Sequence, residues 1–298
     1  MRIFYSELAE NPTYYSFGYS VYATLEDEDS IKEAFNKGFL PCIIAQDQSK
    51  RLMYQTRGVR ILAQEFIQRH YHLRVARKVS EIGEITGHIH EKNSFVIDED
   101  FYSFFLNYFS FRFGADSMPR DRLKAILDSE WITHISEYRL SEKPVAYMLE
   151  HHSESLIHVW YQAYDKEYES SHLGSYAYTS LIERAKREKK TYVYFGVSYG
   201  PWMRYKANFT PLEYWDGSNW IRDENGKRLK TILDEGIRPL ALVDRWRNEQ
   251  KPFYAPPTLS GLEREMRFLT MMLEGAPRSS FFLLFGLFIC IGIIIVLL

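Results

Sequence analysis

Residues 132–196 read ITHISEYRLSEKPVAYMLEHHSESLIHVWYQAYDKEYESSHLGSYAYTSLIERAKREKKTYVYFG and contain the pattern that decides the fold. The stretches ISEYRL, PVAYML and LIHVWYQAY combine branched and aromatic residues with the alternation typical of strands. A helix is predicted from Ser175 to about Lys189, after the turn at Gly174, and the run TYVYFGV predicts a further strand. This order of elements predicts a mixed sheet with flanking helices, in which the helix offers free N–H groups to a phosphate or acyl oxygen.

The charge and cysteine content exclude several classes of protein. The chain has 298 residues, 37 of them basic and 39 acidic, with a net charge of −2. Such a chain lacks the overall positive field that non-specific coating of nucleic acid needs, so an RNA partner requires local basic patches. The two cysteines, Cys42 and Cys290, are too few for a zinc ribbon or an iron–sulfur cluster. We therefore expect no metal and no cofactor.

The C-terminal residues 281–298, FFLLFGLFICIGIIIVLL, contain no charged side chain. As a helix they would measure about 27 Å, close to the roughly 30 Å of the apolar part of a bilayer. Arg267 and Arg278 precede this stretch and no charge follows it, which favours a body on the cytoplasmic side. The sequence thus predicts a single-pass C-terminal membrane anchor.

Several motifs, inside residues 132–196 and beyond them, share one resemblance. The run YVYFG (192–196) is followed by WMRYK (202–206) and by Phe209-x-Pro211-x-Glu213, and the chain also contains EYRL (137–140), LGSY (173–176) and YQTR (54–57) followed by Arg60. Together these motifs resemble the aminoacyl-tRNA–protein transferases, a family that includes the eukaryotic arginyltransferase and the bacterial aspartate/glutamate leucyltransferase of the N-degron pathway. The resemblance is clearest over residues 101–220. The chain departs from the family at Ile135-Ser136, where a His-Gln pair is often found, and in keeping only Cys42 near its N-terminus.

The resemblance implies an acetyltransferase-like (GNAT) sheet within an α/β (α+β) fold. The expected organisation is a divergent, cysteine-poor N-terminal α+β module (1–97), a GNAT-like aminoacyltransferase domain (98–250), an amphipathic juxtamembrane segment (251–280) and the transmembrane tail (281–298). An acyl-CoA enzyme of this fold typically has Arg or Gln three residues before the first glycine of its turn and a small residue two after it. Ser171 and Tyr176 occupy those positions around Gly174. The turn therefore argues against CoA as the ligand.

The implied reaction moves an amino acid from aminoacyl-tRNA to the N-terminal α-amine of a protein, expected to be one that starts with an acidic residue. The aminoacyl ester is already activated, so no nucleophilic side chain is required, and positioning alone can supply roughly 7–11 kcal/mol. Hydrogen-bond donors to the tetrahedral oxyanion would add to this effect. The candidate catalytic groups are the backbone N–H groups of Gly174, Ser175 and Tyr176. The side-chain hydroxyls of Tyr138 and Tyr194 are further candidates.

Two pairs of cations are candidates for binding the substrates. Arg57 and Arg60 form one pair, and Arg204 and Lys206 form the other, on one face if their segment is extended. An arginine fork suits a carboxylate, so one pair is expected to bind the acidic side chain and the other the RNA phosphate or ester. The further candidates for substrate binding are Tyr54, Arg139 and Tyr205.

Two basic segments are candidate tracks for the acceptor stem of the RNA. The first follows the predicted helix and comprises Arg184, Lys186, Arg187 and Lys190, and the second comprises Arg69, Arg74, Arg77 and Lys78. For each segment, the sequence alone favours the alternative of an ordinary solvated face, which Glu183 and Glu188 balance on the predicted helix.

Two other functions remain open on the sequence alone. One is an acyl-CoA-dependent GNAT N-acyltransferase, which saturable binding of CoA would favour. The other is a non-catalytic, membrane-tethered adaptor that binds N-termini or RNA without turnover.

Overall fold

The computed structural model describes residues 1–6, 20–25, 27, 29–42, 51–114, 117–198 and 200–235. The chain divides into two compact units, residues 1–251 and 252–298, and every described residue belongs to the first. The predicted juxtamembrane segment and transmembrane tail both lie outside the described residues.

A small antiparallel sheet forms near the N-terminus. Its strands are β1 (Arg2–Ser6), β2 (Ser20–Leu25), β3 (Phe39–Pro41) and β4 (Arg51–Gln55), in the order β1-β2-β4-β3. Helix α1 (Asp29–Asn36) contributes Phe35, which is fully buried against this sheet and against Tyr194 of the large sheet. The small sheet therefore shares a core with the large one.

The large sheet has the order β12-β11-β5-β10-β9-β8-β7-β6. Its strands are β5 (Gly58–Leu62), β6 (Ile85–Glu91), β7 (His134–Leu140), β8 (Lys143–His152), β9 (Leu156–Tyr164), β10 (Tyr192–Val197), β11 (Leu212–Trp215) and β12 (Trp220–Asp223). Strands β9 and β10 are parallel and the other neighbours are antiparallel. The predicted mixed α/β sheet is thus confirmed.

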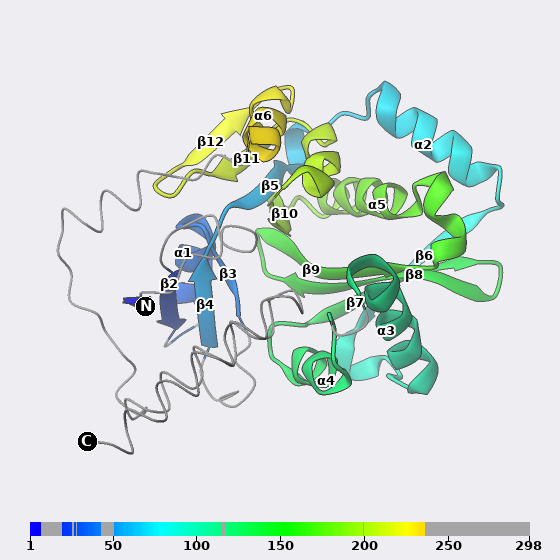
Figure 1. The fold of residues 1–298 in the computed structure, drawn as a ribbon, viewed down its shortest axis with the longest axis horizontal. Coiled ribbons are helices and arrows are strands. Elements are labelled where there is room, and N and C mark those ends of the chain that lie inside the picture. The colour runs from blue at the N-terminus through cyan, green and yellow to red at the C-terminus, as the bar shows by residue number, and fades with distance from the viewer. Residues whose placement is uncertain are drawn as a thin grey trace, which may run out of the picture. The chain divides into compact units, whose positions relative to one another are not determined.

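Helices cover both faces of the large sheet (Figure 1). One face packs against α2 (His70–Ser80), α5 (Leu173–Arg187) and α6 (Lys227–Glu235), and the other against α3 (Glu99–Phe113) and α4 (Arg120–Asp128). Alternation along β8 explains this arrangement, because Met148 faces the α5 core whereas Tyr147 and Leu149 face α3 and α4. Short 3₁₀ helices complete the fold: η1 (Ala63–Glu65), η2 (Lys92–Ser94), η3 (Lys166–Ser171) and η4 (Pro201–Asn208).

The predicted membrane localisation is contradicted. Within the described part of the chain, no helix is both long enough and apolar enough to cross a bilayer. The longest described helices, α3 and α5, have 15 residues each, which corresponds to about 22 Å and falls short of the bilayer core.

Candidate active site

The two parallel strands at the centre of the large sheet separate after a short paired stretch. Strand β10 pairs with β9 only where Tyr192–Tyr194 faces Leu156–His158, although both strands continue further. Beyond an irregularity, β10 still pairs with β5, at Val197 and Gly58. Gly196 adopts a φ of 70° within this bend, a conformation that favours glycine. The bend therefore leaves backbone groups of β10 without partners on β9, and we call this region the strand splay.

Lys206 stabilises the strand splay from η4. Its Nζ donates hydrogen bonds to the carbonyl oxygens of Phe195 at 2.6 Å and Val197 at 2.5 Å. These two carbonyls flank Gly196, so the amine bridges the bend itself. The side chain is only 4% exposed, and burial lowers the pKa of Lys206 to about 7. Among the described carboxylates none forms an ion pair with it.

The depressed pKa of Lys206 predicts that stability rises with pH. The unfolded lysine titrates near its ordinary value of 10.5, so the cost of burying its charge is fully present below about pH 7 and disappears between pH 7 and 10.5. Relative to a Lys206→Met variant, the wild-type free energy of unfolding should increase by about 2–3 kcal/mol from pH 7 to pH 9. Urea unfolding of both proteins at these two pH values measures the difference. Parallel pH dependences in the two proteins would contradict the assigned shift.

Four tyrosines gather beside the strand splay. They are Tyr108 on α3, Tyr164 on β9, Tyr178 on α5 and Tyr205 on η4, and we call them the tyrosine cluster. The rings of Tyr108 and Tyr164 lie 4.8 Å apart, and those of Tyr178 and Tyr205 lie 6.1 Å apart. Burial raises the pKa of each hydroxyl. The hydroxyls therefore stay protonated near neutral pH and can donate hydrogen bonds.

The start of α5 meets β9 at close range. Gln162 Nε2 donates to the carbonyl oxygen of Gly174 at 3.0 Å, and a Cβ at Gly174 would lie 2.9 Å from the ring of Tyr164. The N–H groups of Ser175 and Tyr176 donate to the His172 carbonyl oxygen at 2.9 and 3.1 Å. Of the predicted oxyanion donors at this turn, two are thus already used. The N–H of Gly174, in the first turn of α5, is the remaining candidate donor.

The two tyrosine hydroxyls predicted as oxyanion donors serve the fold instead. Tyr138 is 3% exposed and donates to the Ala177 carbonyl oxygen at 3.0 Å, while fully buried Tyr194 accepts a hydrogen bond from Arg60 Nη1 at 3.0 Å. Tyr108, Tyr164 and Tyr178 were not predicted from the sequence, because they come from three elements that no sequence spacing relates.

The first pair of predicted substrate cations is buried. The Nε and Nη2 atoms of Arg60 both lie 2.6 Å from Glu213 Oε2, and its guanidinium lies 3.9 Å from the Tyr192 ring centroid. Arg57 is 5% exposed, and Tyr54 packs against the core of the small sheet. A substrate carboxylate would have to displace Glu213, so the predicted role of Arg60 is corrected to a structural ion pair.

The second pair of predicted cations does not share a face. Residues 201–208 form the 3₁₀ helix η4 rather than an extended segment. Arg204 consequently lies at the surface, 53% exposed and 3.3 Å from Asp234, whereas Lys206 is buried at the strand splay. Arg139, near the end of β7, forms ion pairs with Glu137 and Glu142.

The predicted RNA track on α5 is largely bound to the protein itself. Arg184 lies 2.5 Å from Glu150 Oε2, and Lys186 and Lys190 donate to the carbonyl oxygens of Phe66 and Ser153 at 3.0 and 2.6 Å. Arg187 alone of the four is exposed without such a partner in the described part of the chain. The C-terminal half of α5 lies against the sheet, so these cations reach inward instead of outward.

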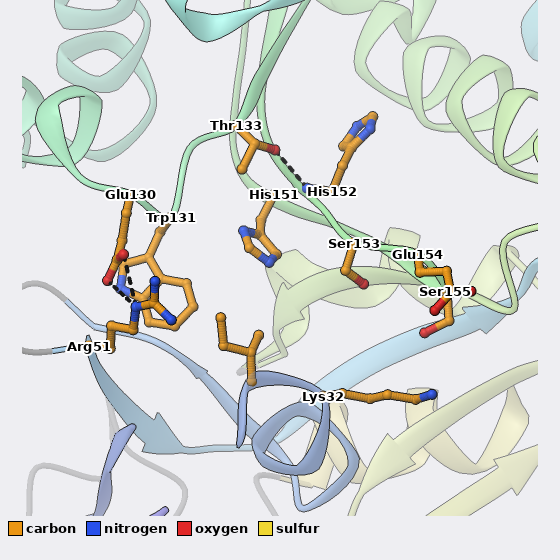
Figure 2. Close-up of a pocket in the computed structure, with 11 residues that line it drawn as sticks. Lys32, Arg51, Glu130, Trp131, Thr133, His151, His152, Ser153, Glu154 and Ser155 are labelled. Atoms are coloured by element: carbon orange, nitrogen blue, oxygen red, sulfur yellow. Dashed lines mark hydrogen bonds and ion pairs between the residues drawn. The ribbon is translucent and has the colours of Figure 1, made fainter. Parts of the chain in front are cut away.

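A cavity of about 400 Å³ lies elsewhere, between the small sheet and the turn from β8 to β9. Its lining comprises Ile31, Lys32, Arg51, Glu130, Trp131, Thr133, His151, His152, Ser153, Glu154 and Ser155. Figure 2 shows His151 between Trp131 and Ser153, with Arg51 held by Glu130. None of the residues predicted from sequence as site residues lines this cavity. We place the candidate active site at the strand splay, where donors, neutral hydroxyls and a buried amine meet.

Residues 99–216 match the family described as arginine-tRNA-protein transferase, C terminus. A relative from Saccharophagus degradans, named aspartate/glutamate leucyltransferase, is 25% identical over 130 residues, which cover 41% of this chain and 55% of the relative. A second protein of that name, from Bradyrhizobium diazoefficiens, is 28% identical over 182 residues, or 55% of this chain and 68% of the relative. The matches confirm the resemblance predicted from the sequence, and the chain spans little more than half the length of the first relative.

Two solved structures overlap with part of the fold. The C-terminal domain of a putative lysylphosphatidylglycerol synthetase from Agrobacterium fabrum covers 48% of this chain and 46% of its own, at 10% identity and a TM-score of 0.36. The structure of L-PGS from Bacillus licheniformis covers 58% and 50%, at 14% identity and the same TM-score. Overlap at this level carries no conclusion about function.

Proposed function

We propose that this chain, which resembles the arginine-tRNA-protein transferases over residues 99–216, transfers an amino acid from aminoacyl-tRNA to the N-terminal α-amine of a protein. The observation that carries the proposal is the strand splay with its tyrosine cluster and the N–H of Gly174. These groups offer neutral hydrogen-bond donors where β9 and β10 separate. Such donors stabilise the negative charge that develops on the carbonyl oxygen of an acyl group during transfer.

The reaction needs no covalent intermediate on the enzyme. The acceptor nitrogen, once deprotonated, attacks the ester carbonyl carbon, and a new C–N bond forms in a tetrahedral intermediate. The bond from that carbon to the ribose oxygen then breaks, and the ribose oxygen takes up a proton as the amide forms. The protein's part is to position the two substrates and to donate hydrogen bonds to the carbonyl oxygen as its charge grows.

A direct assay tests this proposal. The full chain is incubated with each aminoacyl-tRNA, radiolabelled in the amino acid, and with peptides that begin with different residues, and label in the peptide is measured. We expect label from at least one donor and none from the free amino acid. Failure with every donor would refute transfer, and labelling from acyl-CoA would instead favour an N-acyltransferase.

We extend the proposal to acceptors that begin with aspartate or glutamate, because both relatives carry those residues in their names. Arg112 on α3 is the cation proposed to bind the acidic side chain. Burial raises the pKa of Tyr164 and of Tyr205, whereas the positive charge of Arg112 lowers both pKa values. Arg112 therefore lies near the tyrosine cluster. It pairs with Glu169 at 2.8 Å, but both side chains are about 40% exposed, and such a pair is easily exchanged for a substrate carboxylate.

Replacing Arg112 with glutamine should therefore change the choice of acceptor. We expect kcat/KM for an Asp-initiated peptide to fall about 10- to 100-fold, as for a lost charged hydrogen bond, with a much smaller change for an Ala-initiated peptide. The Glu169→Gln variant is the matched control, since it breaks the same ion pair and leaves the arginine in place. Equal losses for both peptides, or equal effects of both variants, would refute this role.

A further inference from the structure

The outward face of α2 carries a compact group of cations. Arg77 and Lys78 lie three and four residues after Arg74, so both are its neighbours on one side of the helix. The opposite side, which includes Val75 and Val79, is buried in the core. In the described residues no carboxylate forms an ion pair with any of the three cations. We call these three side chains the α2 stripe.

The α2 stripe runs toward the start of α5. Tyr71 Oη donates to Ser175 Oγ at 2.9 Å, which fixes the two helices together at that point. Burial lowers the pKa of His172, the residue that precedes α5, and the charges of Lys78 and Arg74 lower it further. Two of the three cations thus face the same turn as Gly174. Figure 1 shows α2 beside α5 at the edge of the molecule.

The α2 stripe differs from the other basic segment by what its cations contact. Arg184 and Lys186 on α5, and Lys190 just after it, form their contacts with the protein itself. On α2, the stripe ends near exposed Glu81 and Glu84, which limits its length but leaves the three cations exposed or half-exposed to solvent. A row of cations that forms no ion pair with the residues the structure describes suits a partner with regularly spaced negative charges.

We propose that the α2 stripe binds the phosphate backbone of the RNA that carries the amino acid. This inference rests on the proposed function, which supplies the RNA as a substrate. The stripe covers little more than one helical turn and suits two or three phosphates. Because it borders the turn at His172, it would leave the 3′ end of the RNA near the strand splay. Phosphate contacts of this kind supply affinity and orientation without reading the base sequence.

A binding experiment on the full chain tests the α2 stripe without requiring catalysis. Anisotropy of a labelled, uncharged tRNA is measured at several salt concentrations for the wild type and for the variant Arg74→Gln/Arg77→Gln/Lys78→Gln. We expect binding about tenfold weaker or more at 0.1 M salt, and a log–log salt slope smaller by about 2. The matched control is Arg120→Gln/Arg122→Gln/Lys124→Gln on α4, which makes the same charge change on the other face of the sheet. The control should stay within about twofold of the wild type.

The possible outcomes separate this inference from the proposed function. An α2 variant that keeps the wild-type affinity and salt slope overturns the inference, as does a wild type that binds no RNA. Loss of binding to an acidic peptide, without loss for tRNA, also overturns it. If the wild type binds tRNA through the stripe but transfers no amino acid, the proposed function fails and the inference stands. Far-ultraviolet circular dichroism checks that α2 remains helical, which glutamine favours.

Discussion

Replacing Lys206 with methionine should reduce amino acid transfer at least about a hundredfold, because a shift of about 1 Å at a positioned site can cost that much. Methionine matches the length and apolar stem of lysine but donates no hydrogen bond. The carbonyl groups of Phe195 and Val197 would lose the donor that bridges the bend at Gly196. We expect β10 to move toward β9 there. The positions of the tyrosine cluster and Gly174 relative to β10 would then change. Single-turnover transfer with saturating tRNA measures the chemical step directly.

A matched variant lies two residues earlier on the same 3₁₀ helix. Arg204→Met also removes a cation, but Arg204 is 53% exposed and pairs with Asp234 at the surface, so transfer should change by less than about threefold. Equal losses of transfer activity in the two variants would mean that both cations contribute to the site. They would contradict a strand splay that Lys206 alone stabilises. Thermal unfolding of each variant shows whether lost activity reflects lost folding.

Replacing Gly226 with alanine should destabilise the protein by more than about 4 kcal/mol, which is exceptional for a single substitution. A Cβ at this position would lie 1.8 Å from the carbonyl oxygen of Ala207, and the φ of 73° adds strain for any side chain. The backbone cannot easily yield, because Asp223 accepts hydrogen bonds from the N–H groups of Gly226 and Leu229, both at 2.9 Å. Ala207 follows Lys206 in the chain, so a displaced η4 would also disturb the strand splay.

Gly114→Ala provides the comparison for that substitution. Gly114 also has a positive φ, of 100°, but a Cβ there would meet nothing within 4 Å. Its replacement should therefore cost only the backbone strain, about 1–3 kcal/mol. Urea unfolding of both variants gives the two free energies. Similar losses would mean that strain, rather than the clash with Ala207, dominates at Gly226.

Secondary structure in the middle of the chain follows closely from local sequence. The stretch LIHVWYQAY coincides with β9, and the helix predicted from Ser175 to about Lys189 matches α5. Residues 51–55 and 58–62 follow one another closely in the sequence, but they form β4 and β5 in two different sheets. Periodicity reports whether a segment is extended, but the sheet it joins depends on partners far along the chain, so this division could not be predicted.

The candidate site shows the same limit at the level of side chains. Lys206 was predicted to bind substrate as one of a pair of cations with Arg204, whereas the structure directs its amine to the backbone of β10. Arg60 looked like a carboxylate-binding fork, and it does bind a carboxylate, that of Glu213, 153 residues away. In each case the partner of the cation comes from the tertiary fold, which the residue type alone does not specify.

The position of β5 has a consequence for dissecting this protein. Residues 58–62 lie between β10 and β11, so the segment that the family match covers, 99–216, surrounds a strand that it does not encode. A fragment cut to the limits of that match would leave two facing edges with unsatisfied backbone groups and would be prone to aggregate. Any minimal version of the catalytic part must therefore begin before Gly58.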